Sequence, residues 1–159
     1  MNFQLKTSVS NHDTPNRNEQ DRMKLKVLIA TIALGVAAGT AFAELGDESK
    51  VPAGSKKRVS YKKDIKPVFE KSCLKCHSGS RPKAKYLMDT VANIIKGGSS
   101  DEAAIIPGNA KKSPIVHYCL DLVEDLEMPP TSKRDKYPAM TKAQIADMIA
   151  WIDQGARDN

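Results

Sequence analysis

Two of the three cysteines in this sequence stand beside a histidine, in the pentapeptide Cys73-Leu74-Lys75-Cys76-His77. The spacing C-x-x-C-H is the attachment signature of c-type haem. Its two thiols add to the two vinyl groups of haem, and the next residue then lies under the iron as the proximal imidazole ligand. The motif therefore predicts a fold built around one covalently bound haem c, held by Cys73, Cys76 and His77.

Composition limits what else the chain can be. A length of 159 residues allows one domain of ordinary size, and an aromatic content of 5% excludes a large aromatic core. Three cysteines are too few, and odd in number, for a disulfide scaffold. The net charge of +6 comes from dispersed lysines with little aromatic sequence between them, so we expect no nucleic-acid partner.

The N-terminal part of the chain is typical of an export signal. Residues 1–22 are polar and aperiodic, which predicts a disordered leader or a mis-called start, with Met23 as the true start. Residues 23–43 combine a short basic start, the uncharged apolar run Val27–Ala43 and the small-residue end Ala41-Phe42-Ala43. These are the three parts of a secretory signal peptide, and they predict cleavage after Ala43.

Export agrees with the haem motif, because in bacteria haem is attached outside the cytoplasm. We therefore expect a periplasmic protein that meets a membrane only if the signal peptide stays uncleaved. In that alternative, Val27–Ala43 is a membrane anchor, although it is shorter than the roughly 20 apolar residues that a span needs. Residues 44–59 are rich in Gly, Pro, Ser and charge, which predicts a flexible linker before a folded domain at residues 60–159.

Four short helices are predicted in that domain, and no convincing strand. Ser60 can cap the first, in which Pro67 either kinks the helix or marks its effective start. The second spans residues 89–96, and the third opens at Ser113-Pro114. The fourth begins with a capping box of Thr141 and Gln144. The fold class is thus all-α, with long loops at residues 77–88, 97–112 and 127–140 that need a central group to organise them.

A haem of this kind usually takes a sixth ligand, and Met128 is the preferred candidate. It follows an acidic run and precedes Pro129-Pro130, so a stiff loop can present its thioether. Met88 and Met140 are the alternative methionines. His117 is a rival that would give bis-His ligation and a lower potential, although a histidine in the core or on a helix surface is the simpler interpretation.

The third cysteine and the C-x-x-C pair allow other interpretations. Cys119 is expected to be a small buried apolar residue on the face of Ile115 and Leu122, with a thiolate ligand or an intermolecular disulfide as the alternatives. The C-x-x-C pair could be half of a zinc site, for which His117 and Cys119 are the only further ligands available. It could also be a redox dithiol, but no βαβ pattern surrounds it.

Residues 60–159 resemble a small class I cytochrome c, and more narrowly the Planctomycete-type cytochrome c domain. The resemblance rests on segments in the same order, namely Asp64–Phe69, the C-x-x-C-H motif, Ile106-Pro107-Gly108, Lys112-Ser113-Pro114, Met128-Pro129-Pro130, Thr141, Gln144, Ile145 and Trp151–Ala156. It implies a cytochrome c-like bundle in which the helix before the motif packs on the last helix. It also implies that Cys73, Cys76, His77 and Met128 hold the haem.

The expected function is that of an exported monohaem electron carrier rather than an enzyme. Its partner would be a redox protein. If the lysines and arginines on both sides of the motif guide this partner to the haem, its docking face should be acidic. One alternative is a haem-based sensor or peroxidase-like enzyme, which needs Met128 to leave the iron. Another is a zinc-binding interaction module.

Overall fold

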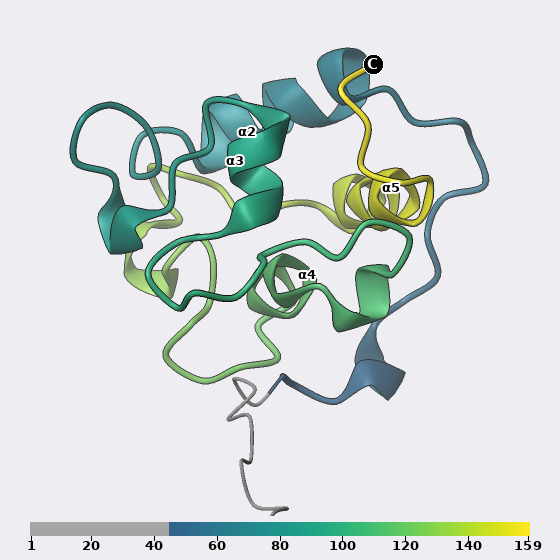
Figure 1. Ribbon diagram of the computed structural model, residues 1–159. Helices are drawn as coiled ribbons and strands as arrows, with labels where there is room; N and C mark the ends of the chain where they lie inside the picture. Colours follow the sequence, from purple (N-terminus) through teal and green to yellow (C-terminus); the bar gives the residue numbers. More distant parts are fainter. Residues whose placement is uncertain (1–44) are drawn as a thin grey trace, which may run out of the picture. The chain divides into compact units, whose positions relative to one another are not determined.

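The computed structural model describes residues 45–159, and the expected leader and signal peptide lie outside them. The described residues are helical and contain no strand, as the all-α prediction requires. Four α-helices lie around the centre of the domain (Figure 1): α2 (Lys66–Ser72), α3 (Val91–Lys96), α4 (Pro114–Cys119) and α5 (Lys142–Asp153). Short helical turns precede α2 or lie between the α-helices: η1 (Glu48–Lys50), η2 (Tyr61–Ile65), η3 (Lys83–Lys85), η4 (Ala110–Lys112) and η5 (Thr131–Lys133).

The first predicted helix is present, but its first turn is a π-helix. Ser60 caps η2 by accepting a hydrogen bond from the Lys63 N–H, as predicted. Lys66 donates its N–H to the Tyr61 carbonyl, five residues back, and α2 then starts with Pro67 in its first turn.

The helices α4 and α5 begin where the sequence predicts, after Ser113 and after Thr141, whereas α3 begins later than predicted. Thr90 caps α3, which is two residues shorter at its start than predicted and ends at Gly97, where φ is +90°. Both hydrogen bonds of the predicted capping box of Thr141 and Gln144 are present at the start of α5. The third helix, α4, ends at Cys119, so Leu122 lies beyond it.

Aromatic rings join the first and last helices at the core. Trp151 of α5 stacks on Tyr61, with ring centroids 5.4 Å apart, and meets Phe69 of α2 edge to face at 6.4 Å. Ile65, Met148 and Ile152 are fully buried around these rings. This packing fixes α2, and with it the position where the chain leaves α2 at Cys73.

Residues 45–59, expected to be a flexible linker, lie against the helices in the structure. Val51 and Val59 are buried, and the Ser55 N–H donates to the Ala146 carbonyl of α5 at 2.9 Å. Gly54 sits so close to α5 that a Cβ there would lie 2.9 Å from the Ala150 nitrogen. These contacts are long-range, which explains why the local composition of the segment did not indicate them.

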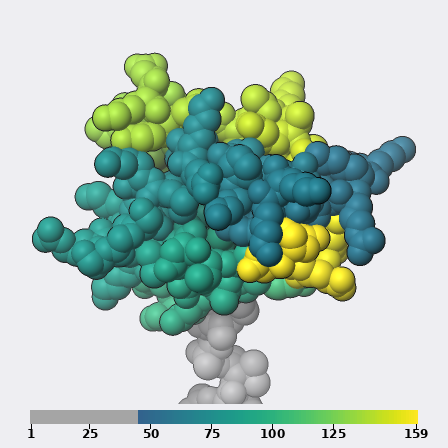
Figure 2. Space-filling view, turned by 90° about the horizontal axis from the view of Figure 1, so that it is seen from above, coloured from purple at the N-terminus to yellow at the C-terminus, as the bar shows by residue number. Residues whose placement is uncertain are grey.

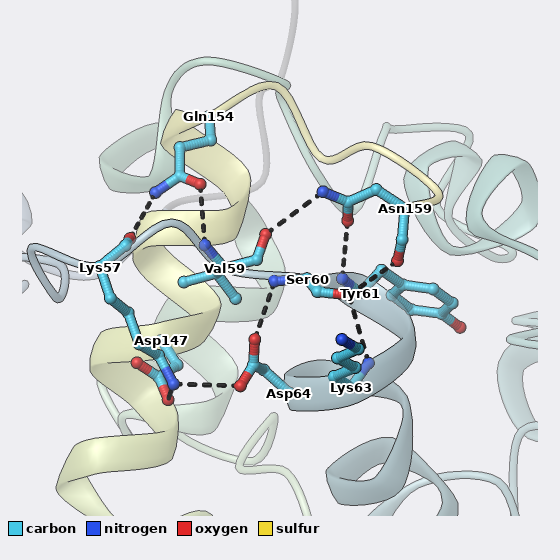
Figure 3. A network of polar contacts seen from close by, with 9 residues as sticks. All are labelled: Lys57, Val59, Ser60, Tyr61, Lys63, Asp64, Asp147, Gln154 and Asn159. Carbon is cyan, nitrogen blue, oxygen red and sulfur yellow. Dashed lines mark hydrogen bonds and ion pairs between the residues drawn. The ribbon is translucent and has the colours of Figure 1, made fainter.

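The C-terminal residues lie next to the start of η2 (Figure 1), and the space-filling view shows the yellow C-terminal part beside the blue part of the domain (Figure 2). The Asn159 side chain accepts a hydrogen bond from the Tyr61 N–H at 2.8 Å, and its backbone oxygen accepts one from the Lys62 N–H at 2.9 Å. Figure 3 shows the contact between Asn159 and Tyr61 together with Lys57, whose ammonium bridges Asp64 and Asp147. These contacts hold the C-terminal Asn159 against η2, and they hold Lys57 against both η2 and α5.

Among residues 45–159, no helix combines the length and the apolar character that crossing a membrane requires.

Candidate functional site

The four predicted site residues line one cavity of about 300 Å³, within the range of sites that hold small ligands and cofactors. Cys73, Cys76 and His77 approach it from the turn after α2, and Met128 approaches it from the segment before η5. The rest of the wall comes from α4, from residues 84–88 and from the loop after α3. These further residues are Ser72, Ala84, Tyr86, Met88, Gly97–Ser100, Glu102–Ala104, Pro114, Ile115, Tyr118, Cys119, Leu126 and Pro129.

The attachment motif folds as a tight continuation of α2. The N–H groups of Cys73 and Leu74 both donate to the Phe69 carbonyl, at 2.8 and 3.0 Å. Cys76 and His77 then donate their N–H groups to the Cys73 carbonyl, both at 3.1 Å. This turn brings both thiols and the imidazole to the same cavity. Burial raises the pKa of the Cys73 thiol to about 12, so that thiol stays protonated near neutral pH.

His77 is held in an orientation that suits a metal ligand. Its Nδ1 lies 3.2 Å from the Tyr86 carbonyl oxygen, and its ring lies 5.2 Å from the Tyr86 ring. When Nδ1 carries the proton and donates to this oxygen, the lone pair of Nε2 is free to bind iron. Burial lowers the pKa of His77, which also favours the neutral imidazole that a metal needs, although the hydrogen bond to Tyr86 opposes this shift.

Hydrogen bonds hold Met128 in place on the segment before η5. Its N–H donates to the Tyr118 carbonyl of α4 at 2.9 Å, and the Met128–Pro129 peptide bond is cis. Arg134 fixes the same segment, because its Nε donates to the Pro129 carbonyl at 2.9 Å while its two terminal nitrogens bind the Asp121 carboxylate. The thioether therefore sits on a wall that backbone and side-chain hydrogen bonds both support.

The alternative sixth ligands lie in different places. Met88 also lines the cavity, and its N–H donates to the His77 carbonyl at 2.8 Å, which places its backbone beside the proximal residue. Met140 and His117 are buried outside the lining of this cavity. His117 Nε2 lies 2.6 Å from the Lys111 carbonyl, so that nitrogen already has a partner. Of the four candidates for the sixth ligand, the structure places Met128 and Met88 in the lining of the cavity and Met140 and His117 outside it.

The loop after α3 forms a part of the wall that the sequence did not predict. Gly97 has a φ of +90°, and a Cβ on it would collide with the Glu102 carbonyl oxygen. A Cβ on Gly98 would collide with the Ala84 carbonyl oxygen, and the next residue, Ser99, donates its N–H to that oxygen at 2.8 Å. Two glycines are thus needed for the loop to pass this closely over residues 84–86 and line the cavity.

Tyr86 and Tyr118 are two further cavity residues that the sequence analysis missed. The Tyr86 hydroxyl donates to the Ile94 carbonyl at 2.9 Å, while its own carbonyl meets His77. Tyr118 contributes its carbonyl to Met128. The hydrogen bonds to His77 and Met128 use backbone carbonyls, which any residue type carries, so no sequence pattern could have found these two contacts.

The chemistry of the cavity suits haem better than a bare metal ion. An imidazole, a thioether and the two thiols of the attachment motif face a wall that is otherwise mostly apolar. Nowhere in residues 45–159 do three or more His, Cys, Asp or Glu side chains come together in a group that could hold a metal ion. A zinc site made by Cys73, Cys76, His117 and Cys119 therefore has no support in this part of the chain.

Residues 73–132 match the family model described as Planctomycete cytochrome C. The match supports a Planctomycete-type cytochrome c domain in this part of the chain. The match starts at Cys73 and extends past Met128, so it includes every residue proposed above to hold the haem. A cytochrome c domain implies a haem cofactor and suggests an electron carrier. No curated protein and no solved structure matches the chain.

Proposed function

We propose that this chain is an exported monohaem c-type cytochrome that transfers electrons. Cys73 and Cys76 form the thioether bonds, His77 is the proximal ligand and Met128 the distal ligand. The observation that carries this proposal is that two separate chain segments bring these four side chains to one cavity. The family match over residues 73–132 supports the same assignment.

The bound haem supplies an iron that gains and loses one electron. The residues of the chain hold it, orient its ligands and keep water away. His77 presents Nε2 because Tyr86 accepts the proton-bearing Nδ1. Met128 supplies a neutral, soft thioether, and Met/His ligation raises the reduction potential relative to two imidazoles. The mostly apolar wall acts in the same direction, because a low dielectric disfavours the more highly charged ferric state.

We further propose that the partner is a redox protein with an acidic face. Four basic side chains close to the attachment motif, Lys75, Arg81, Lys83 and Lys85, are exposed. None of these four takes part in the ion pairs found in the described part of the chain. They can therefore steer an acidic surface to the part of the domain where the haem is attached, and this association would weaken with added salt.

The proposed location is the periplasm. The export pattern at residues 23–43 supports this location. Export is also what haem attachment requires, because it takes place outside the cytoplasm. Retention of Val27–Ala43 as an anchor would place the same domain at the periplasmic face of the membrane. N-terminal sequencing of the protein isolated from the periplasm separates these two cases, because cleavage after Ala43 leaves Glu44 as the first residue.

Covalent attachment is the test of the proposal. The protein is produced together with a bacterial haem-attachment system, and denaturing electrophoresis followed by haem staining is the readout. We expect the haem to remain with the polypeptide, and to be lost when Cys73→Ala and Cys76→Ala are combined. Cys119→Ala is the matched control, because this third cysteine lines the same cavity outside the motif. Haem lost from the Cys119→Ala control but kept by the double variant would show that the attachment residues are wrongly assigned.

A further inference from the structure

A second cavity of the domain, of about 420 Å³, has no role in the function proposed above. It is lined by residues 56–59 and by Trp151, Gln154, Arg157 and Asn159. None of these residues lines the cavity of the attachment motif. Half of the lining residues are basic and none is acidic, so this second cavity, the basic cavity, attracts anions. Its volume is within the range of sites that hold small ligands.

Hydrogen bonds hold together the two chain segments that line the basic cavity. The Gln154 Nε2 donates to the Lys57 carbonyl at 2.9 Å, and its Oε1 accepts the Val59 N–H at 3.0 Å (Figure 3). The Trp151 indole N–H donates to the Arg157 carbonyl at 2.9 Å, which fixes the C-terminal segment against α5. The backbone of both segments is therefore in place before any ligand binds.

Three of the four cations that line the cavity have no carboxylate partner in residues 45–159. Lys57 is neutralised, because its ammonium bridges two carboxylates at distances of 3.1 and 2.9 Å. Lys56, Arg58 and Arg157 are exposed, and none of them takes part in the ion pairs of the described residues. One guanidinium thus comes from each of the two segments.

The acceptors at the end of the chain are bound elsewhere. The Asp158 carboxylate lies 3.8 Å from the Lys62 ammonium. The Asn159 backbone oxygen accepts hydrogen bonds from the Lys62 N–H and from the Ser60 hydroxyl, both at 2.9 Å. Neither group therefore supplies the anion that the three cations lack.

We propose that the basic cavity binds a phosphate group, carried either by a small molecule or by a lipid headgroup. A guanidinium presents its N–H donors in a planar fork that matches two phosphate oxygens, and Arg58 and Arg157 supply two such forks. Three unpaired cations also favour a dianion over the single charge of a carboxylate. The inference does not rest on the proposed function, because the basic cavity shares no lining residue with the haem site.

Calorimetric titration of the purified holoprotein with inorganic phosphate tests the small-molecule source. Sodium chloride keeps the ionic strength constant, because exposed charges respond to salt alone. We expect saturable binding that Arg58→Gln or Arg157→Gln weakens about tenfold, and that the double variant loses. Neither side chain forms an ion pair in the described residues, so the melting temperature and the haem content should stay unchanged.

The matched control combines Arg81→Gln with Lys83→Gln. It removes the same charge from two exposed side chains that do not line the basic cavity. This control should bind phosphate as the wild type does. Equal weakening in the control and in the double variant of Arg58 and Arg157 would show that net charge is responsible, and would overturn the inference.

Cosedimentation with phosphatidylcholine vesicles, with and without phosphatidic acid, tests the lipid source. Binding that requires phosphatidic acid, and that is lost in the double variant but kept in the control, would identify a lipid headgroup as the ligand. Saturable binding of inorganic phosphate without such vesicle binding would identify a small molecule. Absence of binding in both experiments would disprove the phosphate site.

Protection from phenylglyoxal, which modifies arginine side chains, locates the bound phosphate. Mass spectrometry should find Arg58 and Arg157 protected when phosphate is present, while Arg81 is modified to the same extent with and without it. Equal protection of all three arginines, or of none, would contradict binding in the basic cavity.

Discussion

The Nδ1 atom of His77 lies 3.2 Å from the carbonyl oxygen of Tyr86, and the Tyr86 hydroxyl lies 2.9 Å from the carbonyl oxygen of Ile94. One tyrosine thus connects the proposed proximal ligand to α3. Its ring is also in contact distance of the imidazole, with centroids 5.2 Å apart. The orientation of His77 therefore depends on a residue outside the attachment motif.

Tyr86→Phe should destabilise the domain without changing the iron ligands. The variant keeps the backbone carbonyl that meets His77 but removes the half-buried hydroxyl that donates to Ile94. Loss of a hydrogen bond of this kind costs about 1 kcal/mol, and the melting temperature should fall by roughly 5 °C. Tyr137→Phe is the control, because no hydrogen bond of the described residues uses the Tyr137 hydroxyl. Equal melting temperatures for the two variants would argue against this role of Tyr86.

Gly97→Ala should be far more harmful than Gly108→Ala. Both glycines have positive φ, +90° and +83°, so the backbone strain of about 1 kcal/mol is common to both variants. Only the Gly97 Cβ meets backbone, whereas nothing lies within 4 Å of a Cβ at Gly108. We therefore expect a lower melting temperature and less bound haem for Gly97→Ala alone. Similar values for the two variants would mean that the loop over residues 84–86 moves easily.

Arg134→Met should loosen the Met128 segment. The variant loses the hydrogen bond to Pro129 and the ion pair with Asp121, together about 1–2 kcal/mol because the guanidinium is only partly exposed. Heating ferric protein should then abolish the weak red absorption of the iron–sulfur bond at a lower temperature than in wild type. Lys133→Met, at an exposed neighbour, serves as the control. A band that survives equally in both variants would show that Arg134 does not position Met128.

Asp64 should contribute stability that disappears in acid. The hydrogen bond from the Ser60 N–H, followed by the one from Lys57, lowers the pKa of this carboxyl in the folded protein. A lowered folded pKa stabilises the protein above the unfolded pKa of about 4, and this stabilisation is lost as the pH falls through the folded value. Asp64→Asn should thus lower the melting temperature near pH 6 and bring it closer to wild type below pH 4.

The control for this pH profile is Asp135→Asn, at an exposed carboxyl that forms none of the hydrogen bonds or ion pairs seen in the described residues. Its difference from wild type should stay small across the whole pH range. If the effect of Asp64→Asn were the same at pH 6 and pH 3, the charge of Asp64 would not be the cause.

Local signals in the sequence predicted the helix starts well. Ser60 and Thr141 act as caps, and Pro67 and Pro114 lie in first turns, because each of these effects depends on neighbours within one turn. The end of α4 was predicted less well. Leu122 was expected on its face, but the chain turns at Asp121, where φ is +56° and Arg134 binds the carboxylate.

The candidate site was predictable where its chemistry needs particular residue types. Cys73, Cys76, His77 and Met128 carry side chains that few other residues can replace, and the structure brings all four to one cavity. Tyr86, Tyr118 and the loop at residues 97–104 support the cavity through backbone groups and close packing. Such contributions depend on contacts between distant segments, as does the packing of residues 45–59 on α5, and a single sequence does not reveal them.

The pyridine haemochrome spectrum of the purified protein tests the central claim most directly. It reports how many vinyl groups of a haem have become thioethers, and combined with the protein concentration it gives the haem content. We predict the spectrum of haem c with both vinyl groups saturated, at one haem per chain. A haem with free vinyl groups, or a protein without haem that carries zinc instead, would contradict the account.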